Sequence, residues 1–147
     1  MTVKTGDELK LYFCVDGIGG TPEWTELAIV KDGKFNSKRG EADATVRGSK
    51  RKLSKATMLE ESIEFEIRWD TEDEGFQAFQ DAYLANEPIG IAYMDGEIDA
   101  SGSQGLWADV TVLQFNRNEQ SEQMVTASII VKPTVSENEA EWKVIGE

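Results

Sequence analysis

The chain has 147 residues, the size of a single domain, and we expect residues 1–147 to form one. Its 39% of hydrophobic residues are enough for a core, which excludes a wholly disordered chain. A formal net charge of -13 argues against a reader of nucleic acid, because such a protein needs a basic surface. The sequence shows neither an apolar run of the ~20 residues that cross a bilayer nor a secretory signal. We therefore expect a protein made in the cytoplasm, without membrane contact.

The charge is unevenly distributed along the chain. Between Lys31 and Lys55 there are nine basic and three acidic residues, a net charge of +6. The rest of the chain carries six basic and 25 acidic residues, a net charge of -19. A basic segment on a strongly acidic body can meet an acidic surface on another copy of the same molecule.

The N-terminal part of the chain predicts two strands. Leu, Phe and Val alternate with other residues over residues 8–16, which indicates a strand. The Gly/Pro loop at residues 17–24 is not followed by a helix, so it does not match a phosphate-binding loop. We expect a second strand over residues 24–30 and a turn at Asp32-Gly33.

A basic excursion follows. Residues 41–47 alternate charged and small side chains, which predicts a strand, and residues 48–52 interrupt it with Gly, Ser and three basic residues. Such an excursion in a compact domain either is a solvated loop or holds a partner. Both interpretations stay open at this point.

Residues 61–96 organise the rest of the chain, because they predict a strand, a capped helix and a strand. Ile63, Phe65, Ile67 and Trp69 alternate with polar residues, which is typical of a strand with one buried face.

We expect a single short helix at about residues 72–85, laid over an open edge or end of the sheet. Thr71 and Glu74 have the spacing of a capping box, and Asn86 and Pro88 mark its end. Three aromatic residues of this helix form one apolar stripe that we expect to be buried, namely Phe76, Phe79 and Tyr83.

Further strands complete the predicted fold. Residues 106–115 and 123–133 form a pair joined by a polar linker, and residues 141–146 form a short last strand. The fold class is therefore mainly β, a sandwich or barrel of about seven strands with one capping helix.

The loop at residues 94–105 contains three close acids, Asp95, Glu97 and Asp99. An EF-hand calcium site does not fit, because Ala100 and Leu106 stand where the template needs glycine and a bidentate carboxylate. A solvated hairpin turn is the better interpretation.

The sequence offers few residues for catalysis. It contains no histidine, the commonest general base and zinc ligand, and its single Cys14 allows no internal disulfide and is expected to be buried. The 28 acids supply many carboxylate pairs, but none stands out as a glycosidase pair. We expect no enzyme, no metal site and no cofactor.

The order of elements resembles that of the major tail tube proteins of long-tailed bacteriophages. The residues that carry the resemblance are Trp24-Thr25-Glu26, the charged segment at residues 40–48, Asp70 before the helix, Pro88-Ile89-Gly90 after it, and the final residues 141–146. The resemblance covers nearly the whole chain and is one of pattern, since the family has no short diagnostic motif.

The resemblance implies a β-sandwich that assembles into hexameric rings, with one sheet of each copy forming part of an inner barrel. The rings stack into a tube with an acidic lumen through which DNA passes without specific binding, in a phage tail or an injection machine. Its partners would be other copies and other tail proteins. It would be made in the bacterial cytoplasm and assembled in a virion tail or a tail-like particle.

Two sets of residues take roles under this hypothesis. The basic segment would contact a neighbouring subunit through Arg47, Lys50, Arg51, Lys52 and Lys55. Polar strand faces would line the lumen through Glu41, Asp43, Glu64 and Glu66.

Two other classes stay open. A β-sandwich that binds a small ligand or carbohydrate would explain the four tryptophans, Trp24, Trp69, Trp107 and Trp142, although Trp69 lies on an apolar strand face. A secreted adhesin-like module is disfavoured by the missing signal.

Overall fold

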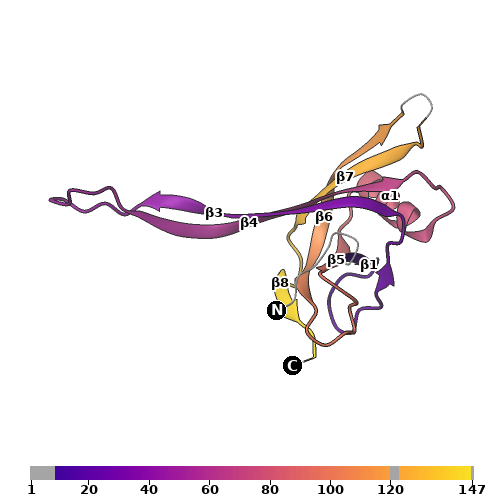
Figure 1. The fold of residues 1–147 in the computed structure, drawn as a ribbon, viewed down its shortest axis with the longest axis horizontal. Helices are drawn as coiled ribbons and strands as arrows, with labels where there is room; N and C mark the ends of the chain where they lie inside the picture. The colour runs from indigo at the N-terminus through magenta and orange to yellow at the C-terminus, as the bar shows by residue number, and fades with distance from the viewer. Residues whose placement is uncertain (1–8, 120–122, 147) are drawn as a thin grey trace.

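The computed structural model describes residues 9–119 and 123–146 (Figure 1). The chain is mainly β, as predicted, with eight strands and one helix among these residues. The elements in chain order are β1 (Lys10–Cys14), β2 (Thr25–Glu26), β3 (Val30–Asp43), β4 (Ser54–Arg68), α1 (Glu74–Ala85), β5 (Ile89–Met94), β6 (Gln104–Asn118), β7 (Thr126–Pro133) and β8 (Glu141–Val144). No helix in the described part of the chain is long and apolar enough to span a membrane.

The eight strands form one antiparallel sheet that bends around β6. The strand order is β2-β1-β5-β6-β7-β4-β3, and β8 also pairs with β6. The first part of β6 pairs with β5 and β8, and its second part pairs with β7. The register shifts between Val112 and Gln114, and such an irregularity bends a strand. The sheet therefore has two halves that enclose a core, as in a sandwich.

The core lies between the two halves and below α1. Ile63, Phe65 and Ile67 of β4 are buried, as their alternation predicts. They pack with buried residues of β1, α1, β5, β6 and β7, which are Leu11, Phe13, Phe76, Phe79, Ile89, Ile91, Val110, Val112, Ile129 and Val131. The core therefore joins the two halves of the sheet, which meet at β6.

Helix α1 begins two residues later than the predicted start, and its cap differs from the prediction. Asp73 is the N-cap, because its Oδ2 accepts hydrogen bonds from the backbone N–H groups of Gly75 at 2.9 Å and Phe76 at 3.1 Å. Thr71 does not cap the helix, so the predicted capping box is wrong. Asn86 ends the helix as predicted, in the left-handed conformation at φ 56° and ψ 47°.

Replacing Asp73 with alanine should lower the free energy of unfolding by about 1 kcal/mol, because two backbone donors lose their acceptor. Thr71→Ala is the matched control, and its stability should stay close to that of the wild type. Chemical denaturation of both variants measures the difference. Equal losses for the two variants would contradict the assigned cap.

The aromatic stripe of α1 is buried only in part. Phe76 and Phe79 are fully buried, as predicted, but Tyr83 is 39% exposed. Its ring stacks on Phe115 of β6 at a centroid distance of 6.0 Å. The prediction was wrong for Tyr83 because its ring stacks on Phe115 and lies outside the buried core cluster.

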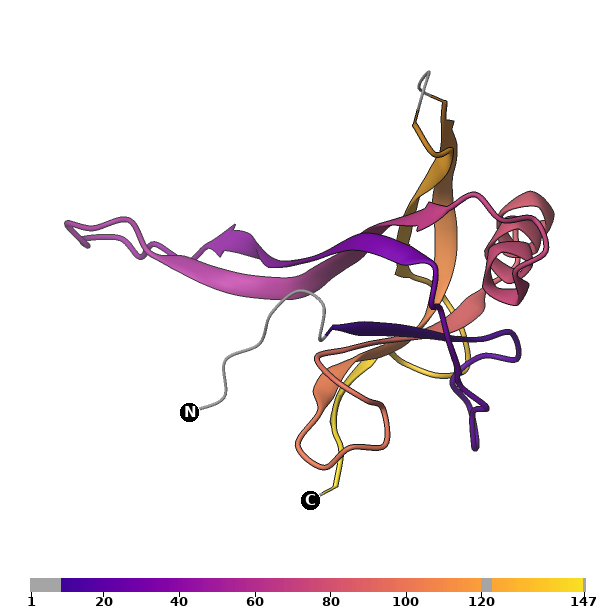
Figure 2. The same cartoon turned by 45° about the vertical axis from the view of Figure 1, so that its right-hand side comes forward.

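Strands β3 and β4 extend beyond the rest of the sheet as a two-stranded hairpin (Figures 1 and 2). We predicted a turn at Asp32-Gly33, and this prediction is wrong. Both residues are part of β3 and pair with Glu66 and Phe65 of β4. A Cβ atom on Gly33 would lie 2.5 Å from the Tyr93 hydroxyl, so glycine here allows the close approach of Tyr93.

Candidate assembly surfaces

We call residues 37–61 the arm, the part of the β3–β4 hairpin that leaves the body of the protein (Figure 1). We predicted a strand over residues 41–47, but strand β3 ends at Asp43. The second half of the predicted strand is part of a turn at the tip of the arm. The seven residues of β3 from Ser37 to Asp43 span about 23 Å at ~3.3 Å per residue. The arm thus reaches well past the core.

The tip of the arm has its own hydrogen bonds. The backbone N–H of Ala44 donates to the Leu53 carbonyl at 2.9 Å, and that of Leu53 donates to the Thr45 hydroxyl at 2.8 Å. The pKa of the Asp43 carboxyl is lowered, mainly by a hydrogen bond from the Thr45 side chain and to a smaller extent by one from the Thr45 backbone. The tip is therefore a turn that is closed by its own hydrogen bonds and carries charged side chains.

The five predicted basic residues gather at this tip. Arg47, Lys50, Arg51, Lys52 and Lys55 are all exposed, and none forms an ion pair within the described part of the chain. The ion pair on the arm joins Lys38 to Glu60 nearer its base, at 3.6 Å. Five uncompensated charges at one end of the molecule favour an acidic partner.

The arm also exposes large apolar side chains, which the charge analysis did not predict. Met58 is 84% exposed, and Val46, Leu53 and Leu59 are exposed too. A two-stranded hairpin without a packed face is marginally stable in water. The arm therefore has the composition of a segment that is covered in an assembly.

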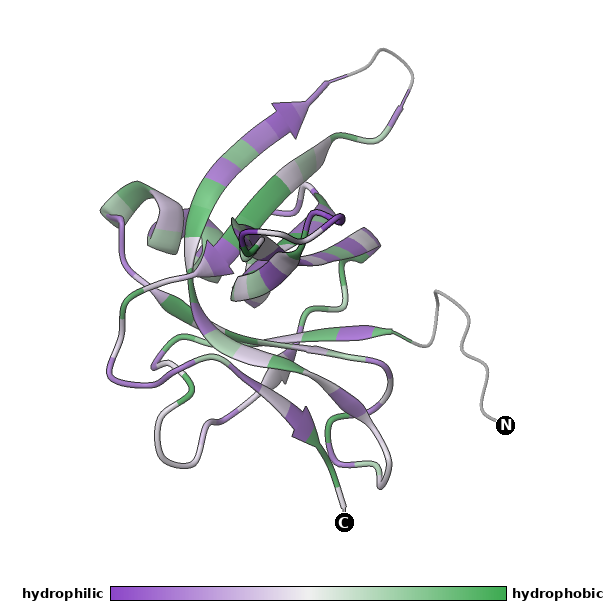
Figure 3. Ribbon diagram, turned by 90° about the vertical axis from the view of Figure 1, so that its left-hand side faces the viewer, coloured by the Kyte–Doolittle hydropathy of each residue, from purple (hydrophilic) through white to green (hydrophobic). Residues whose placement is uncertain are grey.

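A second surface is the outer face of β3, β4, β7 and β6, on the side of the sheet away from the core. Cross-strand pairs such as Lys34–Glu64, Glu64–Ile130 and Gln114–Ile130 place its residues in rows. We call it the four-strand polar face, and its residues are Asp32, Lys34, Asn36, Ser62, Glu64, Glu66, Arg68, Thr111, Gln114, Asn116, Asn118, Thr126, Ser128, Ile130 and Lys132. The alternation that produces it is visible along β6 and β7 in Figure 3.

The four-strand polar face contains two of the four residues that we assigned to a lumen. Glu64 and Glu66 lie on it, half-buried, and Asn36 donates a hydrogen bond to Glu64 Oε2 at 3.2 Å. Glu41 and Asp43 lie on the exposed arm instead. By the alternation of β3 they point to the other side of the ribbon from Asn36.

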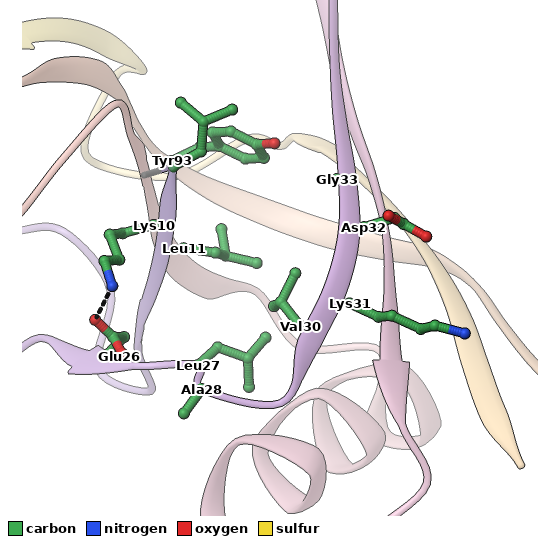
Figure 4. Close-up of a pocket in the computed structure, with 11 residues that line it drawn as sticks. Lys10, Leu11, Glu26, Leu27, Ala28, Val30, Lys31, Asp32, Gly33 and Tyr93 are labelled. Atoms are coloured by element: carbon green, nitrogen blue, oxygen red, sulfur yellow. Dashed lines mark ion pairs between the residues drawn. The ribbon is translucent and has the colours of Figure 1, made fainter. Parts of the chain in front are cut away.

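A hollow of about 560 Å³ separates β1 from β3, where the two ends of the sheet approach without pairing (Figure 4). Leu11, Leu27 and Val30 line it, and the ion pair between Lys10 and Glu26, at 3.7 Å, borders it. Burial raises the pKa of Tyr93, the one aromatic residue of the hollow. Lys10 and Glu26 pair with each other, and Lys31 and Asp32 point away from the hollow (Figure 4), so few polar groups converge in it to orient a small ligand.

The four tryptophans do not form a common platform for a ligand. Trp24 packs edge-on against Trp107 at 5.1 Å, and Trp69 packs against Phe76 at 4.7 Å. Trp142 is exposed, and its Nε1 donates to Gln104 Oε1 at 2.9 Å. Trp142 also packs on Phe35, with ring centroids 6.0 Å apart, so all four are engaged in packing, which does not favour a carbohydrate site.

The described residues offer little chemistry of other kinds. They contain no group of three or more His, Cys, Asp or Glu side chains that could hold a metal ion. Cys14 is a buried free thiol, as predicted. The acidic loop at residues 94–105 joins β5 to β6, as the hairpin interpretation predicted.

No protein-family profile and no curated protein matches the chain at the level of sequence. Solved structures do match. The tail tube of SPP1 matches with a TM-score of 0.73 at 15% identity, over 88% of this chain and 75% of that one. The tail of an empty gene transfer agent particle, computed with C6 symmetry, matches with a TM-score of 0.71 at 10% identity, over 98% of this chain and 100% of that one.

The third match is the baseplate of the anti-feeding prophage, with a TM-score of 0.68 at 10% identity, over 99% of this chain and 98% of that one. The class that these structures define is the tail tube fold, and this chain has that fold. The predicted resemblance to tail tube proteins is thereby confirmed at the level of structure.

Proposed function

We propose that the chain is a structural, non-catalytic subunit that self-assembles into hexameric rings, stacked as a phage tail tube or a phage-like injection tube. One observation supports this more than any other. The protein has a four-strand polar face that is open among the residues the structure describes. Helix α1 leaves it uncovered because it packs on the core side, through Phe79 and Phe65. A polar face of this width is suited to line a water-filled conduit.

The dimensions of the four-strand polar face fit a lumen for DNA. Six copies place 24 strands side by side, and at ~4.8 Å between strands the barrel has a circumference of about 115 Å. Its diameter is then about 37 Å between backbones, and strand tilt widens it further. Such a barrel leaves room for a double helix after the side chains are added.

The charge of this face suits passage of DNA without specific binding. It carries three acidic residues, Asp32, Glu64 and Glu66, and three basic ones, Lys34, Arg68 and Lys132. The wall would thus be close to neutral rather than acidic, and the phosphates would find no continuous track of cations to bind.

The basic tip has a separate role under this proposal. Arg47, Lys50, Arg51, Lys52 and Lys55 would contact an acidic surface of a neighbouring subunit, within a ring or between stacked rings. Other tail proteins would be further partners at the ends of the tube. The subunit would be made in the bacterial cytoplasm and would function in a virion tail or tail-like particle, without a membrane.

The mass of the purified protein in solution tests self-assembly. Size-exclusion chromatography with light scattering, over a range of concentrations, should show species at six copies and above, next to the monomer. A monomer at every concentration and ionic strength would overturn the proposal. It would instead favour a ligand-binding module.

A further inference from the structure

The arm leaves the body at the point where strand β7 stops supporting it. The last pair between β4 and β7 joins Ile63 to Val131, and toward the tip β4 pairs only with β3 among the described strands. Phe35 of β3 is the cross-strand partner of Ile63, and we call this pair the base of the arm. A two-stranded ribbon twists more strongly than a wide sheet and is marginally stable by itself, so the direction of the arm needs support at its base.

Two openings flank the base along β3. Toward the body, the hollow between β1 and β3 lies beside Val30 and Gly33. Toward the tip, a groove of about 640 Å³ lies between residues 36–38 and 59–62 of the hairpin and a wall that includes Lys132 and Pro133. The base therefore has open space on either side.

Between the two openings, Phe35 packs on two aromatic rings from the other half of the sheet. Its ring centroid lies 6.5 Å from that of Tyr93 in β5 and 6.0 Å from that of Trp142 in β8. Leu106 of β6 pairs with both Tyr93 and Trp142 and is buried in the core. Because residues opposite one another in a sheet point to the same side, Tyr93 and Trp142 face the inside of the sandwich and meet Phe35 there.

Strand β8 brings Trp142 to this place. It has four residues and pairs with the first part of β6, below the base of the arm in Figure 1. The hydrogen bond from Trp142 Nε1 to Gln104 Oε1, at 2.9 Å, fixes the orientation of the indole. After the strand, Ile145 makes two backbone hydrogen bonds of 2.8 Å with the loop at residues 94–105. Trp142 remains 54% exposed, so β8 lies across the end of the core as a strap and is not enclosed by it.

A contact at the base has a large effect at the tip. The arm extends about 23 Å from Ser37 to Asp43 at ~3.3 Å per residue, so a small rotation at Phe35 becomes a large displacement of the basic residues. An arm that already points in one direction loses less conformational freedom when a partner covers it. Support at the base therefore prepares the arm for binding.

We propose that β8 is a strap that fixes the direction of the arm, with Trp142 as the positioning residue that holds Phe35. With the strap in place the arm points in one direction, and when Trp142 leaves Phe35 the arm swings about its base. The strap is a property of the single chain and goes beyond the proposed function.

The width of the distance distribution between the tip and the body tests the strap. Dyes are attached at Lys50→Cys on the tip and Asp81→Cys on α1, which are exposed positions, while the native Cys14 is buried. Time-resolved energy transfer is recorded at a concentration at which light scattering shows only the monomer. We expect one narrow distribution in this protein and a distribution at least about two-fold broader after Trp142→Ala, because the two-stranded base then holds the arm with less support.

Three further variants separate the strap from a general loss of stability. Trp142→Phe keeps an aromatic ring against Phe35 and should retain the narrow distribution. Lys143→Ala is the matched control on the other face of β8, where Lys143 lies over the Trp107 ring at 5.1 Å, and it should not broaden the distribution. Phe35→Ala should broaden it as much as Trp142→Ala does, and the double variant should broaden it no further, because both remove the same contact.

Equal widths with and without Trp142→Ala would overturn the strap, and so would equal broadening by Trp142→Ala and Lys143→Ala. Far-UV circular dichroism checks that each variant is folded, and Phe35→Ala tests the same contact from the side of the arm if Trp142→Ala does not fold. Because the measurement is made on the monomer, its result is independent of whether tubes form.

Discussion

Replacing Phe79 with alanine should lower the free energy of unfolding by about 3–5 kcal/mol, the loss typical of a fully enclosed aromatic ring. Phe79 is 0% exposed. Its ring packs edge-on against Phe13 of β1 and Phe65 of β4, at centroid distances of 6.0 Å and 5.3 Å. It therefore joins α1 to both halves of the bent sheet. Urea denaturation at a concentration that keeps the protein monomeric measures the effect.

The control is Leu84→Ala on the same helix. Leu84 is exposed in the single chain, so its removal should change stability by less than about 0.5 kcal/mol. A loss for Phe79→Ala no greater than that for Leu84→Ala would show that α1 does not pack on the core as described.

Reversing the charge of Lys50, Arg51 and Lys52 to glutamate should abolish or shorten the tubes while leaving the monomer folded. The three side chains are exposed at the tip, far from the core, so their change costs little stability. A single exposed ion pair contributes only about 0–1 kcal/mol, but the contact repeats at every subunit. Tube length by electron microscopy and folding by circular dichroism measure the two effects.

Salt dependence provides a second measure of the same contact. The Debye length falls to about 3 Å at 1 M salt, so wild-type tubes should shorten as salt rises. The control exchanges the cations without changing the charge, as Lys50→Arg, Arg51→Lys and Lys52→Arg, and it should assemble like the wild type. Assembly of the glutamate variant equal to that of the wild type at every ionic strength would mean that the tip is a solvated turn.

Much of the fold could be predicted because the hydrophobic pattern determines it. The alternation in β4 correctly identifies its buried residues, Ile63, Phe65 and Ile67. The single helix was also predictable, because Phe76 and Phe79 share one face and Asn86 tolerates the left-handed conformation that ends it.

Other features depend on contacts between distant segments, which a local pattern does not contain. Asp32-Gly33 has the composition of a turn, yet Tyr93 of β5 approaches Gly33 and the segment remains a strand. Thr71 and Asp73 are both good caps, and the packing of Phe76 on Trp69 accompanies the later start at Asp73.

The candidate surfaces were predictable only in part. The charge count finds the basic tip, and the alternation in β4 finds Glu64 and Glu66. The four-strand polar face could not be predicted without the order of the strands. It forms because β4 pairs with β7 and β7 with β6, which places Glu66 beside Ser128 and Ser128 beside Asn116. The exposed Met58 and Leu59 looked like ordinary strand residues, because their lack of a covering layer is a property of the folded arm.

Electron microscopy of the purified, concentrated protein tests the central claim most directly. Averaged end-on images should show a six-fold ring around an open lumen, and a reconstruction of the tube should place Glu64 and Glu66 on the lumen wall. Compact monomers in every image, or a tube whose lumen is lined by another face than β3, β4, β7 and β6, would contradict the account.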